Sequence, residues 1–299
     1  MTHLEREIAT QPDDWASVVG RLPEVAHLLP QRGERVATIG CGTSWFMGQS
    51  YAVLRESLGH GVTDAFAASE NFLDRGYDRV VVITRSGTTT EVIEVVDTLR
   101  AAGTPHVAIV ATPGTPVAEA AESTILLPEV DEQSVVQTRF ATTVLALLRA
   151  SLGDSLDAAI SDARAVLAEG DDTAYDGLVD VEQVTFVGRG WTNGIANEAA
   201  LKLRESVQFW SESYPAMEYR HGPISIAAPG RATWAFGEVP EGLADEVRRT
   251  GAHFEHRDID PMAELVRLQR FCVMRAAKAG IDPDQPRNLT RSIILDDAS

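Results

Sequence analysis

The chain has 299 residues, 44 % hydrophobic and 23 % charged, a composition typical of a soluble globular protein long enough for two domains. Its formal net charge of −18 argues against nucleic acid and anionic membranes as partners. No apolar run approaches the roughly 18 residues of a membrane helix, and the first residues lack the features of a signal peptide. Two cysteines are too few for a disulfide framework. We therefore expect a cytoplasmic location.

The first half of the chain predicts strands that alternate with helices. An amphipathic helix is expected over residues 13–30. Short apolar, β-branched runs then predict strands, and helical periodicity between them predicts helices. Alternation of this kind implies an α/β fold, a parallel sheet with helices on both faces. The expected strands are 35–39, 62–67, 79–84, 106–111 and 124–127, and the expected helices are 44–58, 89–102, 115–122 and 138–152.

The second half resembles the first. The segment from Arg35 to Ser44 is similar to that from Val184 to Asn193, a period near 149 residues, which indicates duplicated domains rather than a solenoid. We expect a first domain over 1–153, an acidic, alanine-rich helical linker over 154–180, and a second domain over 181–299. In the second domain the expected strands are 183–188, 231–236 and 252–258, and the expected helices are 194–208, 241–251 and 261–280.

The most informative stretch is the apolar run from Val80 to Ile83, which leads into Thr84-Arg85-Ser86-Gly87-Thr88-Thr89-Thr90 and then a helix. Hydroxyls and free backbone N–H groups at a helix N-terminus suit an anion such as a phosphate monoester. Ordinary helix capping is the alternative interpretation, but a cap requires only one hydroxyl. The corresponding stretch of the second half, residues 233–239, lacks the serine and threonine cluster.

One predicted helix of the second half carries charged residues suited to acid–base chemistry. Glu198, Lys202 and Glu205 stand at i, i+4 and i+7 and share a face. A solvated salt-bridge face is the alternative, although leucines on either side of Lys202 argue against it. His221 follows in a Gly-Pro loop. A carboxylate and a histidine are the pair needed to open a sugar ring and move a proton between neighbouring carbons.

In several ordered motifs the chain resembles the SIS (sugar isomerase) superfamily, in particular the isomerase half of glucosamine-6-phosphate synthase and the AgaS-type and deglycase proteins. Each motif is weak alone, but their order makes the resemblance specific. The motifs are Gly40-Cys41-Gly42-Thr43-Ser44, Thr84-Arg85-Ser86-Gly87-Thr88-Thr89, Ser134-Val135-Val136-Gln137-Thr138-Arg139, Glu198-x3-Lys202-x2-Glu205, His221-Gly222-Pro223 and Pro286-Arg287-Asn288-Leu289-Thr290-Arg291-Ser292.

The resemblance implies two flavodoxin-like SIS domains, a homodimer with active sites shared between subunits, and a 6-phosphosugar as the small-molecule ligand, with no cofactor and no metal. It implies that Glu205 is the base for C1–C2 proton transfer, that His221 of the neighbouring subunit opens the ring, and that Lys202 and Glu198 support them. It places the sugar phosphate at Thr43, Ser44, Thr84, Ser86 and Thr89, and the sugar at Val135 and Gln137. Arg85 departs from the family pattern, because it replaces a frequent glutamine, and we expect it to add positive charge beside the phosphate.

Departures from the family pattern leave the reaction open. Arg291 stands where the synthase has an imine-forming lysine, and we expect it to hold the sugar's oxygens or phosphate as a fixed cation. No glutaminase domain precedes the predicted sheet, so glutamine is not expected to supply ammonia. Isomerisation, deamination or deglycation of an amino sugar phosphate or fructosyl-amine phosphate therefore all remain possible.

Three other interpretations compete with a phosphosugar enzyme. Gly40-x-Gly42 and Gly188-x-Gly190 suggest a dinucleotide fingerprint, but its third glycine is replaced by Trp45 and by Asn193. A non-catalytic phosphosugar sensor would keep the hydroxyl loop but has no need of Glu205 or His221. A metal site at His253-Phe254-Glu255-His256 is disfavoured because the period of a strand would splay its ligands.

Overall fold

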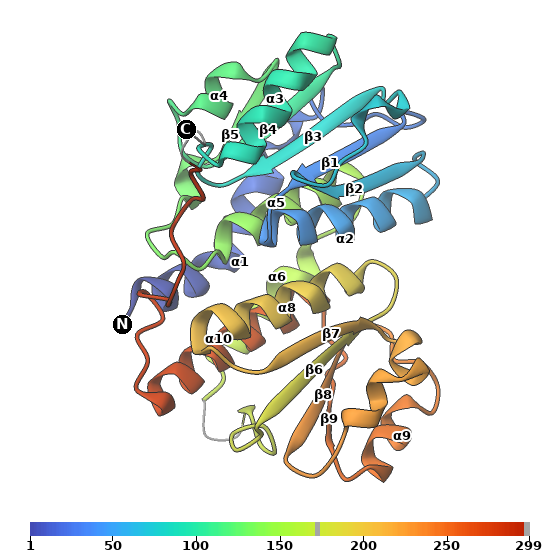
Figure 1. Cartoon of the computed structure of the whole chain (residues 1–299), viewed down its shortest axis with the longest axis vertical. Coiled ribbons are helices and arrows are strands. Elements are labelled where there is room, and N and C mark those ends of the chain that lie inside the picture. The colour runs from blue at the N-terminus through green and yellow to red at the C-terminus, as the bar shows by residue number, and fades with distance from the viewer. Residues whose placement is uncertain (171–173, 296–299) are drawn as a thin grey trace. The chain divides into compact units, whose positions relative to one another are not determined.

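Two parallel β-sheets with their helices make up the part of the chain that the computed structural model describes, residues 1–170 and 174–295 (Figure 1). The chain divides into two compact units. The first unit contains Asp13–Leu156 and the residues from Thr290 on, and the second contains Met1–Pro12 and Asp157–Leu289. Helix α1 (His3–Val25) contributes to both. The α/β class predicted from the sequence is confirmed.

The first unit has a five-stranded parallel sheet of order β2-β1-β3-β4-β5, the order of flavodoxin-like folds. All four residues of the run Val80–Ile83 are fully buried, as expected for a strand covered on both faces. In such sheets ligands bind beyond the carboxyl ends of the strands, where the strand order reverses, here between β1 and β3. The strands are β1 (Val36–Gly40), β2 (Thr63–Ala67), β3 (Arg79–Thr84), β4 (His106–Val110) and β5 (Ser123–Leu126).

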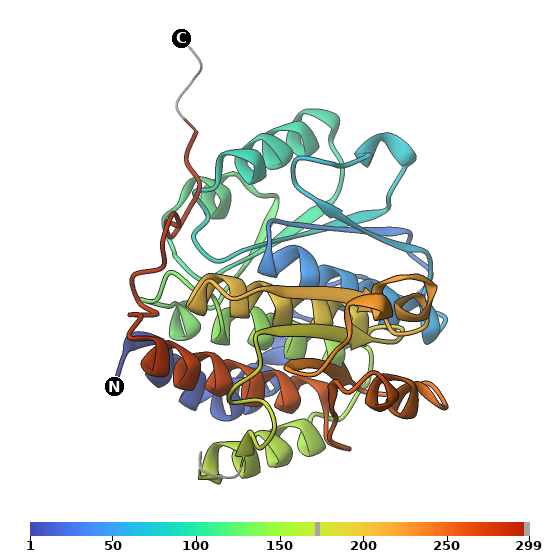
Figure 2. The same cartoon turned by 60° about the horizontal axis from the view of Figure 1, so that its bottom comes forward.

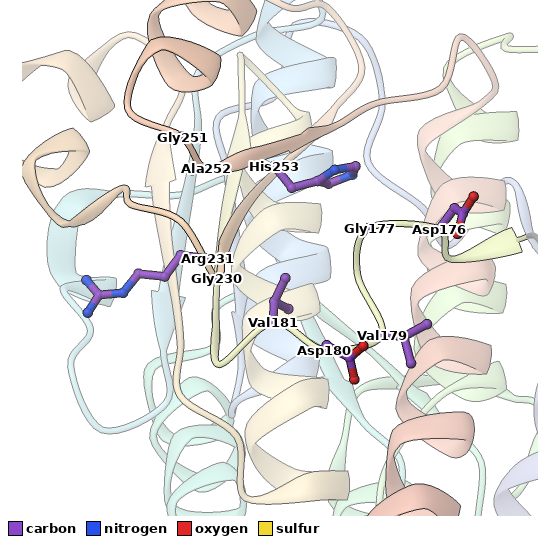
Figure 3. Close-up of a pocket in the computed structure, with 10 residues that line it drawn as sticks. All are labelled: Asp176, Gly177, Val179, Asp180, Val181, Gly230, Arg231, Gly251, Ala252 and His253. Carbon is purple, nitrogen blue, oxygen red and sulfur yellow. The ribbon is translucent and has the colours of Figure 1, made fainter.

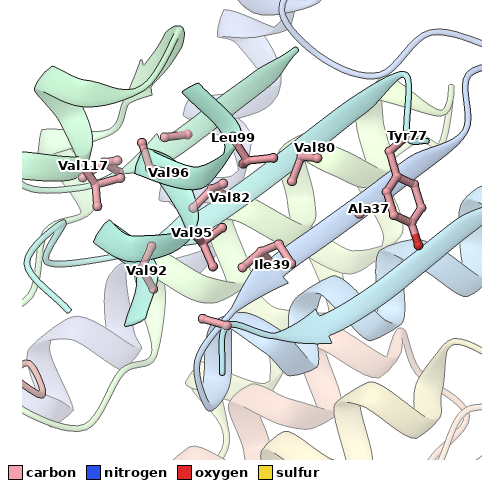
Figure 4. Close-up of a cluster of buried hydrophobic side chains, with 13 residues drawn as sticks. Ala37, Ile39, Tyr77, Val80, Val82, Val92, Val95, Val96, Leu99 and Val117 are labelled. Atoms are coloured by element: carbon pink, nitrogen blue, oxygen red, sulfur yellow. The ribbon is translucent and has the colours of Figure 1, made fainter. Parts of the chain in front are cut away.

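Helices cover this sheet on both sides, with α3 and α4 on one face and α2 and α5 on the other (Figure 1). Alternate side chains of β3, Val80 and Val82, pack with Val92, Val96 and Leu99 of α3 in one hydrophobic core (Figure 4). This core fixes where α3 begins relative to the end of β3. The helices are α2 (Thr43–Ser57), α3 (Thr90–Ala102), α4 (Pro116–Ala120) and α5 (Arg139–Ser151), with 3-10 turns η1 (Leu73–Arg75) and η2 (Pro128–Val130).

The second unit has a four-stranded parallel sheet of order β7-β6-β8-β9. Helix α10 packs against α6 and α8 (Figure 2). The strands are β6 (Gln183–Gly188), β7 (Ser211–Pro215), β8 (Arg231–Phe236) and β9 (His253–Glu255). The helices are α6 (Asp157–Ala168), α8 (Thr192–Val207), α9 (Leu243–Arg249) and α10 (Pro261–Ala279), with 3-10 turns η3 (Glu218–His221) and η4 (Pro223–Ile226).

The structure corrects two predicted boundaries and adds a strand. The helix expected over 13–30 is α1, which begins at His3, where the Asp284 carboxylate accepts from the backbone N–H groups of His3 and Leu4 at 2.6 and 2.9 Å. The strand expected over 252–258 is limited to β9 (His253–Glu255). Strand β7 was not predicted, because Ser-Glu-Ser-Tyr-Pro has no apolar pattern.

The predicted linker over 154–180 contains α6, but its residues 171–173 lie outside the described part of the chain. The domain boundaries proposed from the sequence stay predictions. Across residues 1–170 and 174–295, no helix has the length and hydropathy required to cross a membrane.

Candidate functional site

Two helix N-termini of the first unit follow the strands at which the sheet order reverses. Strand β1 leads through Gly42 into α2, and β3 leads through Thr84–Thr89 into α3. Gly87 is required in the second turn, because its φ is +65° and a Cβ there would lie 2.1 Å from the hydroxyl oxygen of Thr115. The sequence therefore folds this loop closely against α4 and aims its hydroxyls at the carboxyl edge of the sheet.

The predicted phosphate-binding side chains lie in these two turns and are largely buried. The Thr84 hydroxyl accepts from the N–H of Gly87, and the Ser86 hydroxyl accepts from the N–H of Thr88, each at 3.3 Å. Thr89 is the N-cap residue of α3 but makes no side-chain cap hydrogen bond. Helix capping therefore does not explain the hydroxyl cluster. Thr43, Ser44, Thr84 and Ser86 are all at most 7 % exposed.

The C-terminal segment lies against this loop, a contact that the sequence did not predict. The Ser86 and Thr88 hydroxyls donate to the hydroxyl of Ser292 at 3.2 and 3.0 Å, and the Thr89 hydroxyl lies 3.2 Å from it. The backbone of the segment continues the contact: the N–H of Thr90 donates to the carbonyl of Ile293 at 3.1 Å.

Arg85 and Arg291 are both tied to protein groups at this edge. The guanidinium of Arg85 is 1 % exposed, lies 3.4 Å from the Glu132 carboxylate and donates to the carbonyls of Ser134 and Val135 at 2.8 and 3.0 Å. It also donates to the carbonyl of Arg291 at 3.2 Å. Arg291 itself forms an ion pair with Asp131 and donates to the carbonyl of Glu132.

The segment with Val135 and Gln137, predicted to line a sugar-binding cleft, runs from η2 to α5. One carboxylate oxygen of Glu132 accepts from the N–H groups of Thr138 and Arg139 at 2.5 and 2.9 Å, and so fixes the start of α5. The side-chain oxygen of Gln137 is buried and has no hydrogen-bond partner among the described residues. It is therefore a candidate acceptor for a ligand hydroxyl. Glu132 was not singled out from the sequence, and no local pattern there marks it.

In the second unit, α8 brings together the three predicted charged residues. The Lys202 ammonium lies 2.5 Å from the Glu205 carboxylate and 3.5 Å from that of Glu198. Lys202 and Glu198 are only 1 and 2 % exposed, whereas Glu205 is 18 % exposed. The solvated salt-bridge interpretation is therefore wrong. The arrangement holds one carboxylate, that of Glu205, at the boundary with solvent.

The structure does not bring His221 of one chain to Glu205 of the same chain. Helix α8 runs antiparallel to the strands, and Arg204 near its end donates to the carbonyl of Ser211, the first residue of β7. His221 is exposed and lies beyond the other end of β7, in the turn η3. The five residues of β7 span about 13 Å at roughly 3.3 Å per step. The two side chains therefore belong to opposite ends of this strand.

In the second sheet, the side chain of Thr192 lies where the strand order reverses. Thr192, at the start of α8, donates its hydroxyl proton to the carbonyl of Phe236 at 2.8 Å, or to that of Arg189 at 3.0 Å. A Cβ on Gly237 would lie 2.8 Å from the methyl carbon of Thr192. This side chain therefore fills the space where the strand order of the second sheet reverses.

Two other features of the second unit show no catalytic arrangement. A cavity of about 490 Å³ lies at the amino ends of β6, β8 and β9, away from the edge where parallel sheets bind ligands (Figure 3). Of the predicted H-x-x-H pair, His253 contacts Glu255 at 2.9 Å and His256 contacts the carbonyl of Gly237 at 2.9 Å. Over the residues that the structure covers, no group of three or more metal-ligating side chains occurs.

Fold and site together define an α/β protein with a hydroxyl-rich loop where the order of a parallel sheet reverses. The SIS domain family model matches residues 28–152 of the chain, which include this loop. Residues 28–152 therefore match the SIS domain, and the resemblance to the sugar isomerase superfamily is confirmed for this part of the chain.

Curated relatives are similar to the chain over most of its length. A glutamine–fructose-6-phosphate aminotransferase (isomerizing) of Sulfurisphaera tokodaii is 26 % identical over 303 residues, which cover 89 % of this chain and 51 % of the relative. The one of Methanothermobacter thermautotrophicus is 27 % identical over 329 residues, covering 95 % of this chain and 54 % of the relative. The chain thus spans about half the length of the curated relatives it matches.

Solved structures show the same fold. A tagatose-6-phosphate ketose/aldose isomerase of Escherichia coli has a TM-score of 0.82 at 18 % identity, with 100 % of this chain and 98 % of the other covered. A glucosamine-6-phosphate deaminase of Thermotoga maritima has a TM-score of 0.78 at 22 % identity, with 98 % and 100 % covered. At these identities the likeness is evidence for the fold alone.

Proposed function

We propose that the chain binds a 6-phosphosugar and moves a proton between C1 and C2 of its open-chain form, as an isomerase or deaminase. The observation that carries the proposal is the hydroxyl cluster at the N-terminus of α3, at the carboxyl end of β3. Hydroxyl donors and the positive end of a helix dipole suit a phosphate. The names of the relatives and neighbours, which act on 6-phosphosugars, support this ligand class.

In the proposed site the phosphate contacts the hydroxyls of Thr43, Ser44, Thr84, Ser86 and Thr89. The sugar lies along Val135 and the unpartnered side-chain oxygen of Gln137. The phosphate binds mainly through hydroxyls and backbone N–H groups, since the Arg85 and Arg291 guanidiniums are held by protein groups.

We propose that Glu205 is the general base. Its carboxylate takes the proton from one sugar carbon and returns it to the neighbouring carbon, while Lys202 and Glu198 hold it in place. His221 opens the sugar ring from the neighbouring subunit of a homodimer. The separation of His221 and Glu205 along β7 supports a contribution from a second chain.

A thermal-shift panel tests the ligand class. The panel contains the 6-phosphates of glucosamine, galactosamine, fructose and a fructosyl-amino acid. A ligand that binds only the folded chain raises its Tm, so at least one member should raise it, and the S86A variant should lose much of the shift. If none of these sugars raises the Tm of the folded wild-type chain, the proposal is wrong.

A further inference from the structure

We infer that Arg85 is a positioning residue, which fixes the sugar-binding segment relative to the phosphate loop without binding the phosphate itself. The inference rests on the proposed function and assigns a role to an arginine that the sequence suggested as an added cation for the phosphate. It follows from the groups that accept hydrogen bonds from the Arg85 guanidinium.

Four of the five N–H donors of the Arg85 guanidinium are directed at groups of the first unit. One terminal nitrogen serves the carbonyl of Ser134 and the Glu132 carboxylate, and the other serves the carbonyls of Val135 and Arg291. A planar fork with fixed donor directions holds such a set of carbonyls in one geometry. The backbone of Arg85 belongs to the phosphate loop, so its side chain links that loop directly to the predicted sugar cleft.

Charge at this position is compensated inside the protein. Arg85 and Glu132 are 1 and 0 % exposed, and their charged groups lie 3.4 Å apart. Glu132 also accepts from the N–H of Thr138 and so fixes the start of α5. The ion pair of Arg85 and Glu132 therefore connects the end of β3 with the start of α5. The guanidinium of Arg85 already has a carboxylate partner in Glu132.

This role predicts a particular change in binding. Without the Arg85 guanidinium, the loop keeps its hydroxyls and should still bind inorganic phosphate, but the segment at Val135 and Gln137 is no longer held where the sugar needs it. The measured quantity is the ratio of the Kd for inorganic phosphate to the Kd for fructose 6-phosphate or glucosamine 6-phosphate. In R85Q this ratio should fall about tenfold, with the Kd for inorganic phosphate within about twofold of wild type.

Controls separate positioning from stability. The double variant R85Q/E132Q removes both charges, so that no carboxylate is left buried without its cation, and it should show the same fall in the ratio. R55K alters another buried arginine of the first unit, which donates to the carbonyls of Gly61 and Gln31, and should leave the ratio unchanged. An equal loss of phosphate and phosphosugar affinity in R85Q would make Arg85 a phosphate ligand. Two Kd values that are both unchanged from wild type would make it merely structural. If wild type binds neither phosphosugar, the proposed function fails instead.

A second observation carries an independent inference: we propose that Ser292 occupies the phosphate loop, so that the phosphate must displace it. The Ser292 oxygen accepts from the hydroxyls of Ser86 and Thr88 and lies within hydrogen-bond distance of that of Thr89. It thereby takes the donors that a phosphate oxygen would need. The carbonyl of Ile293 likewise takes the N–H of Thr90, in the first turn of α3.

Competition of this kind lowers the affinity for every ligand of the loop by the same factor. The apparent Kd is the intrinsic Kd divided by the fraction of chains in which Ser292 has left the loop. Replacement S292A removes the competing hydroxyl. The Kd for inorganic phosphate and for fructose 6-phosphate should both decrease by about threefold or more, and their ratio should stay constant. This pattern differs from that of R85Q, in which the ratio changes.

The matched control is I294A, which alters a 68 % exposed side chain two residues further along and should leave both Kd values unchanged. Weaker binding in S292A would mean that Ser292 contacts the ligand and completes the site. Unchanged binding would mean that the segment does not compete. Amide exchange gives a second readout: inorganic phosphate should speed exchange at Leu295, whose N–H donates to the Thr90 hydroxyl at 2.9 Å. Unchanged exchange in phosphate-bound protein would also overturn the inference.

Discussion

The ammonium of Lys202 lies 2.5 Å from the carboxylate of Glu205, on the inner face of α8. A second carboxylate, that of Glu198, lies 3.5 Å from the same ammonium and is almost fully buried. One buried cation thus serves two carboxylates of different exposure. Removal of the Lys202 ammonium would leave the buried carboxylate of Glu198 without its cation and should therefore destabilise the fold.

Replacing Lys202 with Met should lower the free energy of unfolding by about 3–5 kcal/mol, because breaking a buried ion pair strands the remaining charge. The other lysine offers a matched control, since Lys278 pairs with Asp180 at the surface, where the side chains are 49 and 90 % exposed. K278M should change stability by less than about 1 kcal/mol. Urea denaturation measures both, and similar small effects in the two variants would contradict the buried network.

Ser86 should contribute to binding more than to folding. Replacing it with Ala removes a hydrogen bond to a charged phosphate, worth about 1.5–3 kcal/mol, so phosphosugar affinity should fall about tenfold or more. Thr98→Ala provides a control on α3, the helix that follows the loop, because that exposed hydroxyl donates to the carbonyl of Glu94. Calorimetric titration decides the question: equal affinities in wild type and S86A would show that the loop is not the phosphate site.

Two inactive variants should complement each other if the site is shared. In a heterodimer of E205Q and H221A chains, one of the two sites combines the wild-type Glu205 of one chain with the wild-type His221 of the other. Co-expressed, differently tagged chains purified as the heterodimer should therefore regain part of the wild-type activity. No recovery would assign both residues to the same chain, and each homodimer alone serves as the control.

Arg291 should not form a covalent adduct with substrate. An imine requires a neutral amine, and a guanidinium cannot supply one. Borohydride reduction in the presence of a phosphosugar, followed by mass spectrometry, should leave the C-terminal peptide unmodified. The ammonium of Lys202 lies between two carboxylates, and an ammonium paired in this way is a poor nucleophile. A reduced sugar adduct on Lys202 would replace the acid–base mechanism with an imine route.

Local sequence patterns were sufficient to predict the strands and helices that form the core of the first unit. The β-branched run ending at Ile83 could only be a buried strand, and glycine with hydroxyls after it placed a turn and a helix N-terminus there. The alternation of such runs with helical periods then gave the parallel α/β class. Strand β7 escaped prediction, because an edge strand of Ser, Glu, Tyr and Pro is defined by its pairing with β6 rather than by its own pattern.

The contacts that distinguish the site depend on residues far apart in the chain. Arg85 and Glu132 are separated by 47 positions, and Ser86 and Ser292 by 206. Neither pair leaves a periodic or spaced signal, so the sequence indicated the residue types but not their partners. The start of α1 was not predicted for the same reason, since Asp284, which accepts from the N–H of His3, lies 281 positions from it. Among the residues proposed to be catalytic, helical spacing alone predicted that Glu198, Lys202 and Glu205 would lie together.

Hydrogen exchange at C2 of a bound phosphosugar tests the central claim most directly. Wild-type chain in deuterated water should exchange the C2 hydrogen of at least one aldose 6-phosphate, or a C1 hydrogen of the corresponding ketose, as followed by proton NMR. Glu205→Gln keeps the shape of the side chain but removes its basicity, so exchange should slow by at least about 10²-fold while binding persists. Exchange that persists at the wild-type rate in E205Q, or a wild-type chain that binds the sugar without any exchange, would contradict the account.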